Sequence, residues 1–347
     1  MVKELIQISK YAGMREDLVQ TGGGNSSVKL GPGCMLIKGM GVQMADMRSG
    51  TGYSVVGQRV FQTFFSQYQG ESVTAEQGES LQAKAYLAGS RPAIETFFHA
   101  LTGRVTLHTH PVLVNVLTAR TGGMEILKEL FPDALTAGYA SPGLALGVAF
   151  FEQMRQCGLD STFKGIAFIK NHGLLVSGDS TEFVMGQTEA VLDKIAAYLH
   201  YDNRANKHVT ELYGWLAEVC DMEDNLVYRA RNADIQSAWD ALAENKHTFC
   251  PDSVVFCGKA LLVLDHGSEA EQIKTYIHRF GVPSVILYDH QTYLVASSMK
   301  KAKEMESVVS FSAETAALNR GHAVDLLPEE EVNFLLDWEV EKFRKNM

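Results

Sequence analysis

Two histidines separated by one residue, His108 and His110, carry the sharpest chemical signal of the chain. Side chains at positions i and i+2 of a strand lie on one face, roughly 6–7 Å apart, so both imidazoles can reach one metal ion. A third imidazole could come from His172, where Gly173 would allow a turn without a Cβ clash. Taken alone, each histidine is more often an ordinary hydrogen-bonded residue than a ligand, since an isolated His-x-His pair is a weak motif.

A carboxylate and another histidine lie shortly before this pair. Glu95 and His99 are four residues apart in a predicted helix that begins at Ile94, so they should share a face and border the same cavity. The alternatives are a solvated helix position for Glu95, and for His99 either a histidine at the edge of the core or a partner that orients a ligand.

A glycine-rich run occupies residues 22–25, with the sequence GGGN. It lacks the lysine of a Walker A motif and does not follow a strand as a dinucleotide-binding loop would. Two interpretations stay open from local chemistry: a tight turn, or a set of backbone N–H groups that binds an anion.

The elements that must hold these residues alternate between helices and strands as far as residue 200, which favours an α/β layered domain. Asp179 and Glu182 have the spacing of a capping box at the start of the last helix. The predicted helices cover residues 3–20, 94–101, 112–118, 142–156 and about 179–200. The predicted strands cover residues 27–30, 35–38, 104–109, 165–170 and 174–177, and residues 60–68 could be either a strand or a helix.

The pattern changes after residue 202, so we predict two domains, residues 1–205 and 206–347, the second a smaller α/β unit. Residues 209–246 are expected to be helical. Strands are predicted at residues 253–256, 260–265, 284–288 and 292–296, and helices at 268–280, 299–318 and after Pro328.

Composition restricts the class of protein. The chain has 347 residues, with 31 Lys and Arg against 41 Asp and Glu, a net charge of −10 that argues against nucleic-acid binding. No apolar run is long enough to span a membrane, and the start resembles no signal peptide. Five scattered cysteines are typical of reduced thiols. We therefore expect a cytoplasmic protein without a membrane partner.

Read in order, the segments resemble the class II aldolase/adducin family over roughly residues 5–200. The segments that carry this resemblance are TGGGNSS, LIKGMG, RPAIETFFH, VTLHTHP, IKNHGLLVSGDS and a long helix that contains Glu189. The resemblance implies a three-layer fold, a sheet flanked by helices.

The resemblance also implies roles for individual residues. His108, His110 and His172 match the family's ligands for a divalent cation, Zn²⁺ or another such as Mn²⁺, Fe²⁺ or Co²⁺, and Glu95 matches its acid/base. The residues that match the family's phosphate-holding loops are Gly23, Gly24, Asn25 and Gly41. Ala93 and Ile94 stand where sugar-phosphate members often carry two serines, so the phosphorylation state of the substrate stays open.

The expected function is that of a metal-dependent lyase (aldolase), which acts on a ketose or ketose phosphate through a metal-stabilised enediolate. Alternatives on the same scaffold are an epimerase, a dehydratase or a decarboxylase. Non-enzymatic alternatives are an adducin-like interaction module and a ligand-binding regulator. The resemblance further implies a homo-oligomer, a tetramer in many members. From residue 249 the chain resembles the extended rhamnulose-phosphate aldolase domains that are fused to a dehydrogenase.

Overall fold

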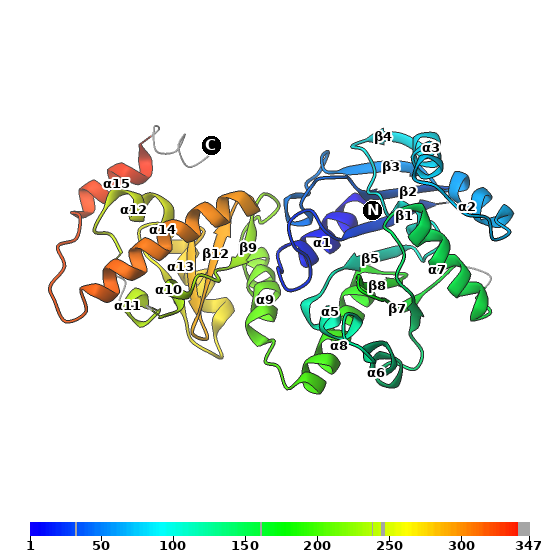
Figure 1. Cartoon of the computed structure of the whole chain (residues 1–347). Coiled ribbons are helices and arrows are strands. Elements are labelled where there is room, and N and C mark those ends of the chain that lie inside the picture. Colours follow the sequence, from blue (N-terminus) through cyan, green and yellow to red (C-terminus); the bar gives the residue numbers. More distant parts are fainter. Residues whose placement is uncertain (32, 160–161, 238, 244–246, 339–347) are drawn as a thin grey trace. The chain divides into compact units, whose positions relative to one another are not determined.

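The computed structural model describes residues 1–31, 33–159, 162–237, 239–243 and 247–338 (Figure 1). The chain divides into two compact units, Met1–Asn203 and Arg204–Met347. Each unit has a sheet and a set of helices of its own.

The N-terminal unit is built on one eight-stranded sheet, with the strand order β4-β3-β2-β1-β5-β8-β7-β6. Neighbouring strands are antiparallel except β6 and β7, which are parallel. The central strands β5 and β8 are buried along their whole length. The strands are β1 (Asn25–Gly31), β2 (Cys34–Lys38), β3 (Tyr53–Gly57), β4 (Tyr86–Gly89), β5 (Val105–Thr109), β6 (Leu135–Ala137), β7 (Gly165–Ile169) and β8 (Gly173–Gly178).

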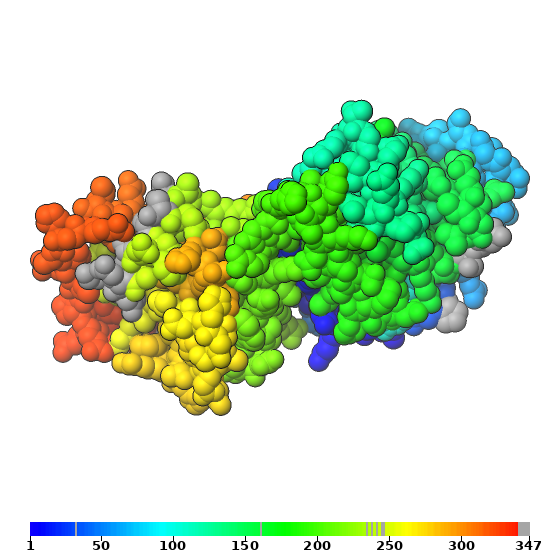
Figure 2. Space-filling model, turned by 90° about the horizontal axis from the view of Figure 1, so that it is seen from below, coloured from blue at the N-terminus to red at the C-terminus, as the bar shows by residue number. Residues whose placement is uncertain are grey.

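Helices cover both faces of this sheet. The helices are α1 (Val2–Gly13), α2 (Gln58–Gln67), α3 (Ala75–Ala85), α4 (Thr96–His99), α5 (Val112–Thr118), α6 (Gly123–Leu130), α7 (Leu144–Gln156) and α8 (Thr181–Leu199), with a 3₁₀ turn η1 (Met44–Asp46). Buried side chains of α1, α5 and α8 pack on the face that carries Val105 and Leu107. Those of α2, α4 and α7 pack on the opposite face. Figure 2 shows this unit with the teal and green residues, which include α5, α6 and α8, at the surface. The predicted three-layer fold is confirmed.

Three local predictions in this unit are wrong. The first helix ends at Gly13 instead of residue 20, since the buried Arg15 side chain binds Asp17 across the turn that follows. The helix predicted from Ile94 is only the short α4. The cap of α8 is Ser180, whose hydroxyl accepts the N–H of Phe183, whereas Asp179 pairs with Lys164. Residues 60–68, left open, lie largely in helix α2.

The C-terminal unit contains a four-stranded sheet in the order β10-β11-β12-β9. Its strands are β9 (Leu226–Arg229), β10 (Leu262–Leu264), β11 (Val285–Tyr288) and β12 (Gln291–Ala296). Its helices are α9 (Arg204–Val219), α10 (Ala233–Ser237), α11 (Trp239–Ala243), α12 (Pro251–Cys257), α13 (Glu269–Phe280), α14 (Met299–Leu318) and α15 (Glu329–Asp337). None of the helices that the structure describes is long and apolar enough to cross a membrane.

Two predictions for this unit are also wrong. Residues 253–256 were expected to be a strand but lie in α12, which Pro251 opens and which packs against α14 and α15. An apolar run of this length fits a buried helix as well as a strand. The expected helical region 209–246 contains strand β9, which pairs with β12, and its residues 238 and 244–246 lie outside the described residues.

Candidate metal centre

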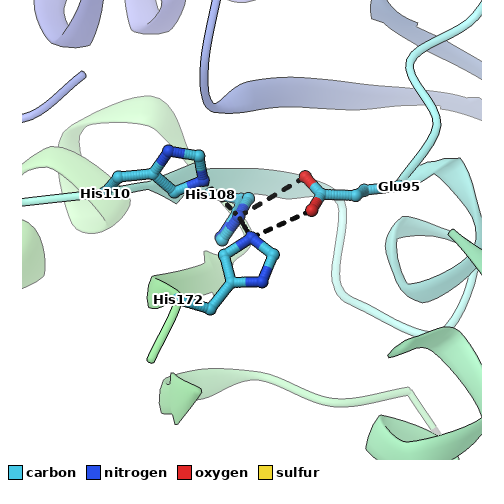
Figure 3. Close-up of side chains that lie close together, drawn as sticks. All are labelled: Glu95, His108, His110 and His172. Carbon is cyan, nitrogen blue, oxygen red and sulfur yellow. Dashed lines mark hydrogen bonds and ion pairs between the residues drawn. The ribbon is translucent and has the colours of Figure 1, made fainter. Parts of the chain in front are cut away.

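Four side chains predicted to act together, Glu95, His108, His110 and His172, meet at one point of the N-terminal unit (Figure 3). One ligand atom of each lies within 4.8 Å of the others. The Nε2 atom of His108 is 3.1 Å from that of His172 and 3.2 Å from that of His110. The Glu95 carboxylate lies 3.0 Å from His172 Nε2 and 3.4 Å from His108 Nε2.

The central strand β5 fixes the first two histidines. His108 lies on the sheet face that α4 covers, since its neighbours Leu107 and Thr109 point to the other face. Its direct partners across the sheet are Asn25 on β1 and Leu175 on β8. His110 follows the end of β5, and its N–H donates to the carbonyl of Leu18 at 2.9 Å.

His172 reaches the site from the tight connection between β7 and β8. The backbone turns at Asn171, with φ of 52°, a conformation that asparagine tolerates better than most residues. The predicted role of Gly173 in the turn is therefore corrected. A Cβ at Gly173 would overlap the carbonyl oxygen of Thr109 and lie 3.2 Å from Cα of His110. Glycine thus allows the two histidine segments to approach each other.

Glu95 is the residue immediately before α4, and its backbone has φ of −95° and ψ of 15°. Its side chain is buried, and the Asn25 Nδ2 donates to Oε2 at 2.7 Å. Glu95 and His99 were expected to share a helix face. Glu95 lies just outside the helix, yet both side chains reach Asn25.

His108 and His110 have the protonation that metal binding requires. His108 Nδ1 lies 2.9 Å from the carbonyl of Leu174, so it carries the proton and leaves the lone pair on Nε2. Burial lowers the pKa of His108 well below its usual value, although the charge of Glu95 opposes this effect. Burial is also the main cause that lowers the pKa of His110, and the neighbouring His172 adds to it. These two imidazoles are therefore neutral at physiological pH.

Glu95, in contrast, is held as an ionised carboxylate. Burial alone would raise the pKa of its carboxyl, but the positive charge that His108 would carry when protonated and the hydrogen bonds from His172 and the Asn25 amide hold that pKa well below its usual range. A carboxylate and neighbouring imidazoles are the donor set that Zn²⁺ and related divalent cations take. Two nitrogens bound at ~2.0–2.1 Å to a tetrahedral ion lie about 3.3 Å apart. The observed Nε2 separations of 3.1 and 3.2 Å are close to this spacing.

The glycine-rich loop also lies beside the histidines. A Cβ at Gly23 would come within 3.1 Å of His110 Nδ1, and one at Gly24, where φ is 63°, within 2.8 Å of the carbonyl oxygen of His108. A Cβ at Gly24 would overlap its neighbours, whereas one at Gly23 would only be tight. Gly41 lies in the turn after β2, with φ of 76° and open space around it. Its place in a substrate site remains a prediction.

A charged residue to which we assign no role from the sequence, Lys38, completes the surroundings. It is the last residue of β2, is buried, and donates from Nζ to the Gly22 carbonyl at 2.8 Å. Burial lowers its pKa to about 8, although the charge of Glu95 acts in the opposite direction. A lysine at the end of the apolar segment MLIK was the available signal.

Comparison with known proteins agrees with the resemblance seen in the sequence. Residues 3–199 match the sequence model of the family described as Class II Aldolase and Adducin N-terminal domain. This match spans more than half of the chain, and the protein belongs to this family. No curated protein matches the chain in sequence.

Several solved structures resemble part of this chain. One is the N-terminal class II aldolase domain of a conserved protein from Thermoplasma acidophilum, with 20% identity, 57% of this chain and 93% of that chain covered, and a TM-score of 0.49. Another is a sugar-phosphate aldolase from Thermotoga maritima, with 14% identity, 57% and 93% covered, and a TM-score of 0.42. A third is L-fuculose-1-phosphate aldolase from Thermus thermophilus, with 18% identity, 58% and 96% covered, and a TM-score of 0.37.

Proposed function

We propose that the protein is a metal-dependent lyase of the aldolase type, which cleaves or forms a carbon–carbon bond in a ketose or ketose phosphate. The observation that carries this proposal is the convergence of Glu95 with three histidine Nε2 atoms in a partly buried site. Membership of the class II aldolase/adducin family supports it.

In this proposal His108, His110 and His172 hold a divalent cation, Zn²⁺ or one of Mn²⁺, Fe²⁺ and Co²⁺. When bound, such a cation supplies positive charge that stabilises negative charge developing on substrate oxygens. The Nδ1–H of His108, held by the Leu174 carbonyl, keeps that imidazole in the tautomer that presents Nε2.

Glu95 is the proposed acid/base. Its depressed pKa favours the carboxylate, which can accept a proton from the carbon beside the substrate carbonyl in the condensation direction. The same group returns the proton in the cleavage direction. Because Asn25 donates to Oε2, the carboxylate is held in one orientation.

We propose that the substrate is a sugar or sugar phosphate, held by Gly23, Gly24, Asn25 and Gly41. The side chain of Asn25 also donates a hydrogen bond to Glu95, so in this proposal Asn25 both binds substrate and orients the carboxylate. Lys38, whose Nζ donates to the carbonyl of Gly22, adds positive charge beside the glycine-rich loop. We further propose a homo-oligomer, with four copies as the expected number.

The first test is metal content per chain, measured by elemental analysis on wild type, His110→Ala and the control His322→Ala, whose side chain is exposed. We expect about one divalent ion per chain in wild type and control, and a strong loss in His110→Ala because a site with two remaining imidazoles binds poorly. Absence of metal from the wild type after reconstitution would contradict the proposal and leave the adducin-like interaction module.

Turnover then separates binding from catalysis. With ketoses and ketose phosphates as substrates, Glu95→Gln should retain metal and lose turnover by about 10²–10⁴-fold, the usual contribution of acid–base catalysis. Product analysis distinguishes an aldolase from an epimerase, dehydratase or decarboxylase. Normal turnover of Glu95→Gln would refute the acid/base role.

A further inference from the structure

A line of hydrogen bonds runs from Glu95 into the core. Asn25 Nδ2 lies 2.7 Å from Glu95 Oε2, the other end of that amide contacts His99 Nε2, and His99 Nδ1 lies 2.7 Å from the Ser27 hydroxyl. All four side chains are buried, with His99 and Ser27 fully inaccessible. Asn25 and Ser27 lie two residues apart on the same face of β1.

The protons in this line can be placed in only one consistent way. An ionised carboxylate only accepts hydrogen bonds, so the amide of Asn25 must face Glu95 with its NH₂ group. Its oxygen then faces His99 and requires a donor, so Nε2 of His99 carries the proton. Burial lowers the pKa of His99 to about 3, so the ring is neutral and has one N–H only. Nδ1 is therefore an acceptor, and the Ser27 hydroxyl donates to it.

The His99 ring is itself held in place. It stacks on the ring of Phe98, with centroids 4.9 Å apart. The backbone carbonyl of His99 accepts the hydroxyl of Thr102 at 2.8 Å. The donor that faces Asn25 therefore comes from a fixed position, as aligned dipoles in a buried network require.

We propose that His99 is a positioning residue, whose Nε2–H fixes the orientation of the Asn25 carboxamide and thereby holds the Glu95 carboxylate between His108 and His172. The inference rests on the proposed role of Glu95 and deepens it. A flipped Asn25 would place its oxygen against the carboxylate, and Glu95 would turn away. What matters is the single N–H of His99 and not the volume of its ring.

Two variants separate the donor from the ring. His99→Gln keeps an N–H donor near the position of Nε2 but loses the ring, whereas His99→Phe keeps the ring and loses the donor. Thr106→Val serves as the control. The Thr106 hydroxyl is also buried, but its hydrogen-bond partners are Thr102 and Ser177 instead of Asn25.

The first measurement is cobalt(II) affinity of the full chain, by chelator competition, together with the visible absorption spectrum of the cobalt-loaded protein. We expect His99→Phe to keep cobalt affinity within about 3-fold of wild type, as Glu95→Gln should, but to shift the visible bands because Glu95 turns away from the site. His99→Gln and Thr106→Val should keep the wild-type bands. Equal band shifts in His99→Gln and His99→Phe would overturn the proposal, since the ring would then matter more than the donor.

The second measurement does not depend on metal or turnover. In crystal structures of the metal-free variants, Glu95 should keep its contact with Asn25 in His99→Gln and lose it in His99→Phe. An intact contact in His99→Phe would refute the positioning role. If His99→Phe does not fold, Ser27→Ala replaces it, because loss of the Ser27 donor releases the His99 tautomer and should disturb the same contact. Failure of the wild type to bind cobalt would refute the proposed function alone, while the crystal structures would still decide the role of His99.

Discussion

Histidines of this protein differ in role because of what each ring nitrogen faces. His108 directs Nδ1 to the Leu174 carbonyl and Nε2 to the other ligands, so one nitrogen orients the ring and the other stays available. In His99 both nitrogens have partners inside the protein, Asn25 and Ser27. His99 is therefore not a ligand, although it lies four residues from Glu95.

This difference predicts a measurable effect of pH on stability. Burial lowers the pKa of His99 to about 3 in the folded protein, whereas a histidine in the unfolded chain has a pKa of about 6.5. Between these values the unfolded state binds a proton that the folded state does not, so stability falls as pH falls through this window. The contribution is at most about 1.4 kcal/mol per pH unit.

The test is urea unfolding of the metal-free protein at pH 7 and pH 5. His99→Gln should lose less unfolding free energy than wild type on acidification, while the exposed-site control His322→Gln should lose as much as wild type. Because His108 and His110 contribute in the same direction, only the difference between variants is diagnostic. Identical pH dependence in His99→Gln and wild type would show that His99 does not carry the effect.

At the level of elements, the end of α1 at Gly13 helps to position the site. Arg15 is fully buried, binds Asp17 at 2.7 Å, and also binds Glu189 of α8. The turn that it holds presents the carbonyls of Asp17 and Leu18 to the N–H groups of Val112 and His110, both at 2.9 Å. Continuing the helix to residue 20 would remove both acceptors from this position.

The start of α8 gives the element-level prediction. Ser180→Ala removes a hydroxyl that caps the helix and should lower the free energy of unfolding by about 1 kcal/mol. Asp179→Ala removes only the ion pair with Lys164, in which both side chains are more than half exposed, and should change stability by less than about 0.5 kcal/mol.

Urea unfolding of both variants at pH 7 checks this pair. A larger loss in Asp179→Ala than in Ser180→Ala would show that Asp179 is the cap after all, as the sequence pattern alone suggested. The comparison needs no assay of activity, because neither residue contacts the four side chains of the site.

At the scale of the whole molecule, the proposed site lies entirely within one unit. The three candidate ligands, Glu95 and the hydrogen-bonded residues as far as Ser27 all belong to Met1–Asn203. The buried clusters on both faces of the eight-stranded sheet also consist of residues from this unit.

We therefore predict that residues 1–203, expressed alone, fold and retain the site. The fragment should unfold cooperatively on heating and bind cobalt(II) with an affinity within about 10-fold of that of the full chain, because its core and ligands are complete. Circular dichroism and chelator competition measure these properties. A folded fragment without cobalt affinity would contradict this prediction.

The sequence by itself determined the residue types of the site and the class of fold. The spacing of His108 and His110 is a local property, because a strand of period two places both on one face whatever surrounds it. The alternation of helical and strand-like segments likewise predicted the layered N-terminal unit. The family resemblance then identified Glu95 and His172 as their partners.

Only the tertiary structure decided which groups hold those residues in place. Asn25, His99 and Lys38 gain their roles because the strand register and the chain turns bring together residues up to about seventy positions apart, as in the Asn25–Glu95 contact. No local pattern encodes such a pairing. The apolar segment of residues 253–256 shows the same principle, since its helix depends on packing against α14 and α15. Burial and hydrogen-bond satisfaction are properties of the assembled fold, and they override local preference wherever the two disagree.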